Sequence, residues 1–295
     1  GGGNMATAII GGLLAKSYPA QNILVSEPLA ESRTRLETQF GVLTSPTNVD
    51  AVRFTPHPSH DGRPADLVVF AVKPQILREV AEGIAAEVDS ARPLIVTIAA
   101  GIRLVDLARW LSPSPTSAAP AIVRAMPNTP ALVGEGATGL FAGAGVSEDA
   151  RALAYSVIGA VSKSTYWVER EELIDVVTGL SGSGPAYFFL MVEALAAAAH
   201  ELGLPLEVAR GLAAQTCLGA GKMLTTSEDD AAELRRKVTS PKGTTEAAIN
   251  SFEASGLRDA CKAAVIAATK RGEELGDVFG KVGTRFFLAG LGAFG

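Results

Sequence analysis

The stretch with the clearest chemical potential is residues 238–252, VTSPKGTTEAAINSF. Hydroxyl residues, a proline, a lysine and a glycine lead into a helical pattern, with Thr244 or Thr245 as the expected N-cap and the apolar residues of 247–252 on its inner face. The first N–H groups of a helix have no partners within it, and Gly243 lets a ligand approach the backbone. The segment can therefore hold a small anion such as a carboxylate beside hydroxyl groups, although an ordinary capped turn stays open as the alternative.

Other short motifs precede this stretch in a fixed order. They are GGGNMA at residues 1–6, AVKPQ at 71–75, AAG at 99–101, MPNTP at 126–130 and LSGSGPAY at 180–187. Together with residues 234–252 they resemble pyrroline-5-carboxylate reductase, the last enzyme of proline biosynthesis, and the resemblance extends to about Leu275. It implies NAD(P)H-dependent reduction of 1-pyrroline-5-carboxylate to L-proline.

The opening GGGNMA fits a variant dinucleotide fingerprint in which small residues let the pyrophosphate approach a helix N-terminus. A Gly-rich cloning scar is the alternative. The fingerprint should follow a strand, and that strand is absent because the chain begins at Gly1. Since a lost central strand leaves its neighbours' edges unpaired, we expect impaired cofactor binding. The resemblance assigns cofactor contacts to Gly1, Gly3, Asn4, Met5 and Ala6.

Ser26 and Glu27 end the second expected strand, where the adenosine ribose of a dinucleotide sits. An acidic side chain there accepts bonds from both ribose hydroxyls and repels a 2′-phosphate, whereas Ser26 could help to bind that phosphate. Glu27 therefore favours NADH slightly, a simply solvated Glu27 stays open, and relatives of the family use either nucleotide. We expect NADPH or NADH.

The resemblance places further backbone and amide groups beside the cofactor. Lys73 is expected to have a positioning role rather than a catalytic one, because Pro74 fixes the backbone after it. Asn128 is expected at the nicotinamide end, with an Asn-Thr-Pro turn as the alternative. The full set of these groups is Asn48, Ala71, Val72, Lys73, Pro74, Ala99, Ala100, Gly101 and Asn128.

The residues that the resemblance places beside the substrate include several hydroxyl side chains. Ser183 suits a helix N-cap and Pro185 an early helical position, and in the family this turn borders the substrate. Glu228 resembles a carboxylate near the ring nitrogen, although a solvated acidic run is the alternative. Lys242 departs from the family, which usually has Gly, Ala or Asn there. The expected substrate contacts are Ser183, Glu228, Ser240, Gly243, Thr244 and Thr245, with the Thr245 hydroxyl as the catalytic candidate.

Apolar patterning divides the chain into two domains and a tail. Short apolar runs alternate with helical patterns up to Trp167, which predicts a Rossmann-like, doubly wound sheet over residues 1–168 with a long loop at 44–63. Residues 169–275 are predicted to be all-helical and to dimerise. Residues 276–295 form a Gly-rich tail without a clear period. The predicted strands are 23–25, 67–72, 94–98, 121–124 and 138–141, and the predicted helices are 4–15, 29–39, 76–87, 104–111, 169–178, 185–202, 206–224, 245–254 and 257–275.

Composition restricts the remaining function classes. The net charge of −5 gives no support to nucleic-acid binding, and three scattered histidines predict no metal site. Cys217 and Cys261 are expected as core residues in a reducing compartment, hence the cytoplasm. The longest apolar run, 185–199, is too short to span a bilayer, so we expect no membrane contact. Its helix, apolar nearly all round, predicts a homodimer or a ring of dimers.

Two alternatives come from other classes. A β-hydroxyacid dehydrogenase shares a similar fingerprint and a helical second domain, but it needs a lysine on the helix after the SGSGP turn, and residues 185–202 contain none. A catalytically inactive dimeric scaffold would be compatible with the missing first strand. A cofactor titration distinguishes the scaffold from the enzyme.

Overall fold

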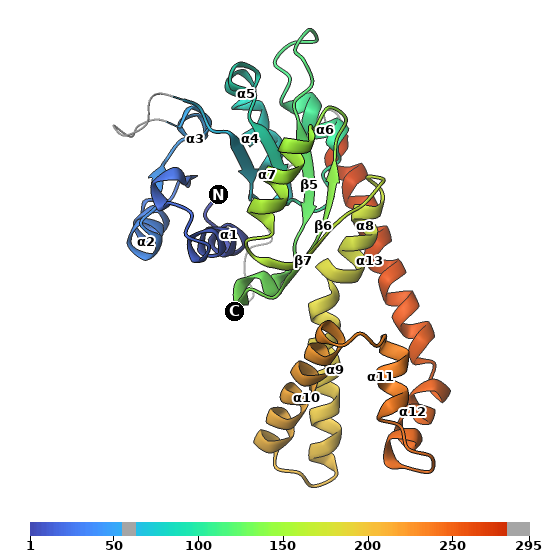
Figure 1. The fold of residues 1–295 in the computed structure, drawn as a ribbon. Coiled ribbons are helices and arrows are strands. Elements are labelled where there is room, and N and C mark those ends of the chain that lie inside the picture. The colour runs from blue at the N-terminus through green and yellow to red at the C-terminus, as the bar shows by residue number, and fades with distance from the viewer. Residues whose placement is uncertain (55–62, 282–295) are drawn as a thin grey trace, which may run out of the picture.

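The computed structural model describes residues 1–54 and 63–281, in which a sheet between two helical layers is followed by a helical domain (Figure 1). The main sheet has the strand order β3-β4-β5-β6-β7. The first three strands run parallel, β6 is antiparallel to β5, and β7 is parallel to β6. The strands are β3 (Leu67–Phe70), β4 (Leu94–Thr97), β5 (Ile122–Met126), β6 (Gly136–Ala142) and β7 (Ser162–Trp167).

A separate parallel pair, β1 (Leu24–Ser26) and β2 (Leu43–Ser45), lies beside this sheet. Within the described residues no strand joins β1 to β3. The first residues of the chain lie between the two pieces, because a Cβ added at Gly1 would lie 2.9 Å from the Ala71 carbonyl and one at Gly2 would lie 3.3 Å from Glu27 Oε2. The fingerprint therefore lies at the carboxyl ends of β1 and β3.

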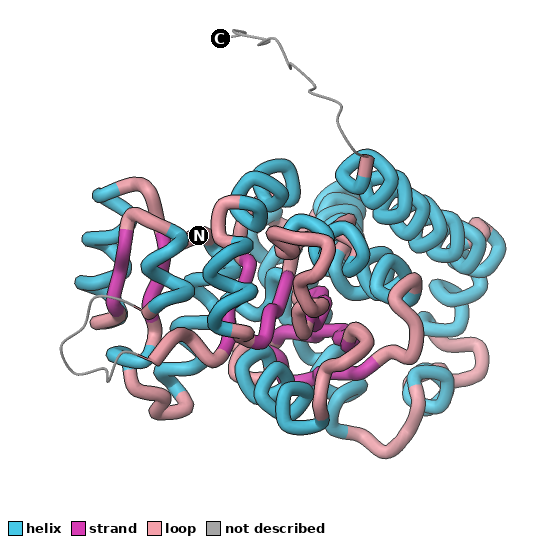
Figure 2. Tube along the Cα trace, turned by 90° about the horizontal axis from the view of Figure 1, so that it is seen from above, coloured by secondary structure: helices cyan, strands magenta, loops and turns pink. Residues whose placement is uncertain are grey.

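Alternating side chains of the strands build two cores, one on each face. In β4, Ile95 packs into the core that α4, α5 and α6 cover, whereas Leu94 and Val96 pack into the core beneath α1 and α7. Figure 2 shows the strands between these helical layers, as a doubly wound fold requires. The helices are α1 (Asn4–Ala15), α2 (Ala30–Phe40), α3 (Asn48–Arg53), α4 (Pro74–Glu82), α5 (Ala85–Ala91), α6 (Leu104–Trp110) and α7 (Glu148–Ile158).

The second domain is helical. A π-helical turn, Thr178–Gly182, connects α8 to α9, and α9 and α10 form an antiparallel hairpin (Figure 1). The last helix, α13, runs back along the sheet domain as far as α6, where Arg109 Nη2 donates to the Gly280 carbonyl at 3.0 Å. The helices are α8 (Leu173–Val177), α9 (Gly184–Glu201), α10 (Leu206–Thr226), α11 (Ala231–Lys237), α12 (Thr244–Ala254) and α13 (Leu257–Gly280).

Several predicted boundaries were wrong. The segment 44–63 contains the end of β2 and all of α3 before residues 55–62, which lie outside the described residues, as do His57 and His60. The single helix predicted over 76–87 is two helices separated at Gly83 and Ile84. The predicted tail begins inside α13, which continues to Gly280, and residues 282–295 are not described.

The apolar run at α9 is longer than the sequence suggested. Because helical structure begins at Leu173, the continuous helical stretch Leu173–Glu201 has 29 residues and a mean hydropathy of 1.2, which by length and composition alone is enough to cross a membrane. The run 185–199 is thus part of a longer helix, and the expectation drawn from its length alone loses its basis. Its exposed side chains include Phe188, Phe189 and Leu190, each more than 60% exposed.

The two cysteines are not core residues within one chain. Cys217 is half-buried and Cys261 is exposed. The inner face predicted for α12 is likewise not buried, since no residue of that helix is. The cysteines and α12 both lie in the helical domain, where apolar faces of a single chain are exposed.

Candidate functional site

The fingerprint loop forms the cradle that a dinucleotide needs. Gly3 is the N-cap of α1 in extended conformation, and a Cβ added there would meet no atom within 4 Å. The first N–H groups of α1 have no partner within the helix and point to this open space. Ala6 is buried beneath them, 8% exposed. The residues present therefore fit a bound pyrophosphate.

Both oxygens of the Glu27 carboxylate accept hydrogen bonds from backbone N–H groups. Its Oε2 accepts from the Gly2 N–H at 2.9 Å, and its Oε1 accepts from the Leu29 N–H at 3.2 Å. Both oxygens thus hold the fingerprint loop and the start of α2 in place. Each oxygen can accept a second hydrogen bond, so the ribose contact expected of Glu27 stays a prediction.

Two arginines of α2 lie at this same place, and the sequence analysis did not single them out. Arg33 Nη1 donates to the carbonyls of Glu27 and Pro28, each at 2.8 Å, and Arg35 Nη2 donates to the Gly2 carbonyl at 3.3 Å. An arginine beside the loop after this strand is the feature that accommodates a 2′-phosphate. Their position in the helix after the second strand was the available signal.

Asn48 begins α3 at the end of β1. The Ser26 hydroxyl donates to Asn48 Oδ1 at 2.6 Å, so two residues expected at the adenosine half lie in contact. Thr47 caps α3 by accepting from the Asp50 N–H. Hydrogen bonds from the hydroxyls of Ser45 and Thr47 lower the pKa of Asp50, with the Arg53 charge adding to them.

The loops after β3 and β4 complete this edge of the sheet. Lys73 is exposed and is the N-cap of α4, with Pro74 as the first helical residue, so the positioning role expected of Lys73 stays a prediction. Ala99 is buried, and Gly101 has a φ of +70°, in the left-handed region. A Cβ at Gly101 would also lie 2.8 Å from Leu275 Cβ, so this loop needs glycine both for its conformation and for contact with α13.

Asn128 follows β5 and joins the two domains. Its Nδ2 donates to the Ser181 carbonyl at 3.1 Å, and its Oδ1 accepts from the Ala137 N–H at 2.9 Å. The side chain is buried and is satisfied at both ends within the protein. The sequence placed Asn128 beside the cofactor, whereas the structure places its polar atoms against the turn that carries Ser183.

Ser183 occupies the N-cap position of α9, as predicted, but its side chain does not cap the helix. Its backbone is already helical, its hydroxyl makes no capping bond, and its N–H donates to the Thr178 carbonyl at 2.8 Å across the π-helical turn. The hydroxyl caps no N–H group because the chain enters α9 from preceding helical structure rather than from a loop. Pro185 stands in the first turn of α9, as predicted.

The turn before α12 is a β-turn fixed by two hydrogen bonds. The Gly243 N–H donates to the Ser240 carbonyl at 3.0 Å, which closes a β-turn with Pro241 and Lys242 at its centre. Lys242 has a φ of +58°, and a turn with proline first and positive φ second is type II, which favours glycine or asparagine there. This explains why the family usually has Gly or Asn at this position, whereas nothing in the structure explains the lysine. The Glu246 carboxylate fixes the turn by accepting from the Lys242 N–H at 2.7 Å.

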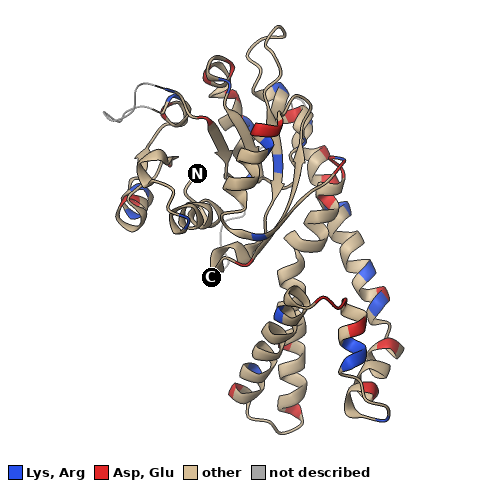
Figure 3. Ribbon diagram, viewed as in Figure 1, with Lys and Arg blue, Asp and Glu red and all other residues tan. Residues whose placement is uncertain are grey.

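The N-cap of α12 is Gly243, so the prediction of Thr244 or Thr245 was wrong. The two threonines are the first residues of the helix, and within the helix their N–H groups have no partners. The Gly243 N–H is not free, because the β-turn uses it. An anion at this turn would therefore meet the N–H groups of Thr244 and Thr245. Basic residues Arg235, Arg236 and Lys237 end α11 just before the turn (Figure 3).

One chain does not bring the two halves of the predicted site together. Ser183 lies near the sheet, whereas α11 and α12 with the turn between them lie at the far end of the molecule from α1 (Figure 1). Glu228, in the linker between α10 and α11, is exposed. The nucleotide-binding edge and the turn at 240–245 are thus separate surfaces in a single chain.

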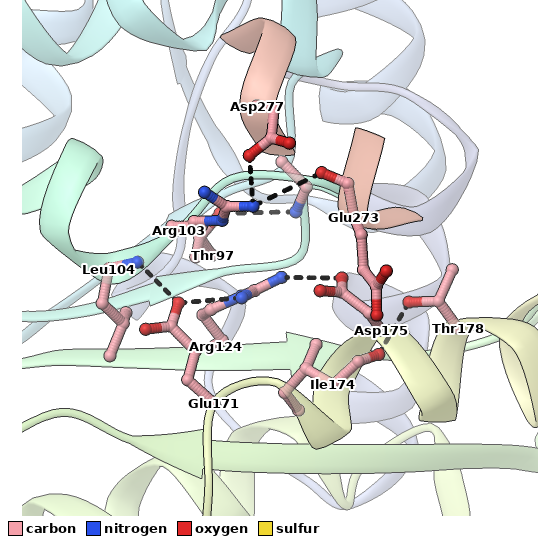
Figure 4. A network of polar contacts seen from close by, with 11 residues as sticks. Thr97, Arg103, Leu104, Arg124, Glu171, Ile174, Asp175, Thr178, Glu273 and Asp277 are labelled. Carbon is pink, nitrogen blue, oxygen red and sulfur yellow. Dashed lines mark hydrogen bonds and ion pairs between the residues drawn. The ribbon is translucent and has the colours of Figure 1, made fainter. Parts of the chain in front are cut away.

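A buried charge network, which sequence analysis missed, fixes the helical domain to the sheet (Figure 4). Arg124 on β5 is 3% exposed, and its guanidinium lies 2.8 Å from Glu171 Oε1 and 3.6 Å from Asp175 Oδ1. Glu171 Oε1 also accepts from the Leu104 N–H at 2.7 Å. An arginine inside an otherwise apolar strand was the available signal, because a buried charge needs a partner.

The last helix adds a second set of contacts to this network. Arg103 pairs with Asp277 at 2.6 Å and donates to the Glu273 carbonyl at 3.4 Å. Burial raises the pKa of Asp175 above its ordinary value, the Arg124 charge opposes that shift, and the Glu273 charge adds to it. Gly272 and Gly276 let these side chains approach the backbone of α13, since an added Cβ would lie 3.3 Å from Asp175 Oδ1 and 3.0 Å from Arg103 Nε respectively.

Comparison with known proteins gives the family. Residues 171–275 match the family model for pyrroline-5-carboxylate reductase dimerisation, and residues 1–101 match that for NADP oxidoreductase coenzyme F420-dependent. The pyrroline-5-carboxylate reductase of Pseudomonas aeruginosa is 44% identical over 95% of this chain and 97% of its own. This chain belongs to the pyrroline-5-carboxylate reductase family. It therefore belongs to a family of NAD(P)-dependent oxidoreductases, as the motifs predicted.

Solved structures of pyrroline-5-carboxylate reductases share the fold. That from Coxiella burnetii is 40% identical, with a TM-score of 0.84 over 93% of this chain and 96% of its own. That from Plasmodium falciparum, solved with NADP bound, is 26% identical, with a TM-score of 0.76 over 94% of this chain and 96% of its own. The predicted combination of a Rossmann-like domain with a helical dimerisation domain is confirmed.

Proposed function

We propose that this chain reduces 1-pyrroline-5-carboxylate to L-proline with NADPH or NADH, the last step of proline biosynthesis. The observation that carries the proposal is the turn at 240–245, which offers two N–H groups without a partner within α12, the Ser240 and Thr245 side chains and the nearby basic end of α11. A small anion with an adjacent polar nitrogen fits this arrangement. The family membership supports the same reaction.

In this proposal each residue of the turn has one task. The N–H groups of Thr244 and Thr245 and the Ser240 hydroxyl hold the substrate carboxylate. The Thr245 hydroxyl orients the ring nitrogen, because an unperturbed threonine is a poor acid. Bound NAD(P)H supplies the hydride, and the fingerprint loop, Ser26 and Asn48 with the loops at 71–74 and 99–101 hold it. Glu228 and Ser183 remain proposed substrate contacts.

We further propose that a second copy of the chain completes the site. The turn at 240–245 lies far from the nucleotide-binding edge of its own chain (Figure 1), and the exposed apolar side chains of α9 and α10 provide the surface that a second copy would cover. A homodimer, or a ring of dimers, would bring one copy's turn to the other copy's cofactor. The match of residues 171–275 to the dimerisation model supports this assignment of the apolar surface.

For the cofactor we propose a preference for NADPH. Arg33 and Arg35 lie at the position of a 2′-phosphate, while both Glu27 oxygens accept backbone N–H groups. This reverses the slight preference for NADH inferred from Glu27 alone.

The remaining assignments are also proposals. The domain boundary is near residue 168, after the last strand. The free cysteines support a reducing, cytoplasmic location. The net charge of −5 supports the absence of nucleic-acid partners, and assignment of the run 173–201 to subunit contact removes the need for a membrane.

The test is an assay of NADPH oxidation with 1-pyrroline-5-carboxylate, with proline formation measured by chromatography. The matched control substrate is 1-pyrroline, which lacks the carboxylate. We expect a kcat/KM about 10- to 100-fold lower for 1-pyrroline, since hydrogen bonds to charged groups contribute about 1.5–3 kcal/mol. NADPH binding without oxidation by either imine would contradict the proposal and favour the inactive scaffold.

A further inference from the structure

We propose that Asn128 is a positioning residue that sets the place of the substrate-bordering turn at Ser183 relative to the nicotinamide end of the cofactor site. The inference rests on the proposed function. The sequence assigned Asn128 to cofactor binding, and the structure shows that its amide bonds to the Ser181 carbonyl and the Ala137 N–H. The geometry points to a link between the two domains.

The link begins in the π-helical turn. Its wider hydrogen-bonding pattern displaces backbone carbonyls from their usual partners, and such turns cluster at functional sites. Three carbonyls in and just before the turn accept bonds from hydroxyls of the same helical run. Ile174 and Val177 of α8 accept from Thr178 at 2.8 Å and Ser181 at 3.2 Å, and Gly179 of the turn accepts from Tyr187 at 2.8 Å. The Ser181 carbonyl, which lies in the turn, instead accepts a side-chain bond from Asn128, on the other domain.

The contact covers two successive residues immediately before Ser183. Asn128 bonds to Ser181, and Met126 of β5 packs so close to Gly182 that an added Cβ there would lie 2.8 Å from Met126 Cε. The amide has a single orientation that satisfies both bonds, because its oxygen meets the Ala137 N–H and its nitrogen meets the Ser181 carbonyl. Ser183 is therefore held against the carboxyl end of β5.

That end of β5 belongs to the edge at which a doubly wound sheet binds its ligand. A displacement of the turn by about 1 Å can lower a rate about 100-fold, even when no reacting group is altered. Loss of the Asn128 bond should therefore impair use of the imine while sparing the cofactor, which the fingerprint loop and the loops after β3 and β4 hold.

The test compares two substitutions that distinguish the two hydrogen bonds of the Asn128 amide. Asn128→Asp removes the donor to Ser181 and keeps an acceptor for Ala137, whereas Asn128→Ala removes both. We expect both to lower kcat/KM for 1-pyrroline-5-carboxylate about 10- to 100-fold, with the dissociation constant of NADPH within about twofold of wild type. Loss of activity in Asn128→Ala alone would overturn the proposal in favour of the Ala137 bond.

Tyr187→Phe is the matched control. It removes a hydrogen bond to the same π-helical turn, but the donor lies on α9 of the same domain rather than on the sheet domain. We expect its kcat/KM to stay within about twofold of wild type. An equal loss in Tyr187→Phe and the Asn128 variants would show that only the local stability of the turn matters, and would overturn the link.

Hydrogen exchange gives a readout that does not depend on the reaction. The amides of residues 178–186 should exchange faster in both Asn128 variants, while those of α1 stay unchanged. Unchanged exchange at 178–186 would overturn the proposal even if the wild type proved inactive on 1-pyrroline-5-carboxylate. Wild-type inactivity with faster exchange would instead contradict the proposed function and leave the link in place.

Discussion

The Thr245 hydroxyl stands in the first turn of α12, beside two N–H groups that the helix leaves unpartnered. If it orients the imine nitrogen, Thr245→Val should lower kcat about 10- to 100-fold and leave NADPH affinity nearly unchanged. Thr245→Ser should keep most of the activity because it keeps the hydroxyl. Since Gly243 is the N-cap, neither change removes a cap. A folded Val variant with wild-type kcat would leave only the backbone amides to hold the substrate.

Arg33 offers a second prediction at the same scale. Replacing it by alanine removes a guanidinium at the proposed 2′-phosphate position, so KM for NADPH should rise about 10-fold or more while KM for NADH changes less than about twofold. Steady-state kinetics with both cofactors give the ratio. Glu31→Ala, two residues earlier on α2, is the control for altered charge, and an equal effect on both cofactors would contradict the assignment.

At the scale of elements, the attachment of α8 to the sheet has a defined pH dependence. Burial raises the folded-state pKa of Asp175, with Arg124 opposing and Glu273 and Glu171 adding to the shift. Folding therefore takes up a proton at Asp175, and the stability that this provides is present below the unfolded pKa and is lost as pH rises through the folded one. Asp175→Asn should match the wild type near pH 4 and become progressively more stable than it toward pH 7.

Urea midpoints at several pH values give this comparison. Both proteins contain Asp50, whose pKa is lowered, and the same other carboxyls. The difference in urea midpoint between variant and wild type therefore reports the effect of Asp175 alone. A difference that stays constant with pH, or that favours the wild type as pH rises, would contradict the prediction.

The elements also show what the sequence could predict. The buried strands of the sheet and the long helices were placed within a few residues, because apolar runs and helical periodicity report burial directly. β2 has only three residues, and β7, SKSTYW, is largely polar, so neither gave an apolar run. The cap of α12 was misplaced because Gly243, with no side chain to accept a bond, precedes two good capping residues.

Contacts between distant segments were beyond the sequence. The motifs predicted the residues of the cofactor loops, yet only the structure shows that Glu27 holds Gly2 and that Asn128 holds Ser181. Arg124 and its carboxylates lie 47 residues or more apart, and no local pattern pairs them.

For the whole molecule we predict a dimer or larger assembly. Leu190 on α9 and Tyr166 on β7 are each 67% exposed, but only Leu190 belongs to the proposed subunit surface. Leu190→Glu should weaken self-association at least about 100-fold, because burying a leucine contributes about 1.5–3 kcal/mol and a symmetric dimer buries it twice. It should lose activity in parallel.

Sedimentation at micromolar concentration measures the association, and Tyr166→Glu is the matched control that should stay associated. A monomeric wild type would contradict the prediction. So would a Tyr166→Glu variant that dissociates as readily as Leu190→Glu, because the effect would then not be specific to the helical domain.

The path of α13 has a consequence for synthesis of the chain. Arg103 and Arg124 belong to the sheet domain, but their acidic partners lie between Glu171 and Asp277. While the ribosome is still translating α9 to α12, both carboxylates that pair with the buried Arg124 have been synthesised, whereas Arg103 still lacks Asp277. The domain that is translated first therefore makes this ion pair with a residue of α13 that is translated 174 residues later.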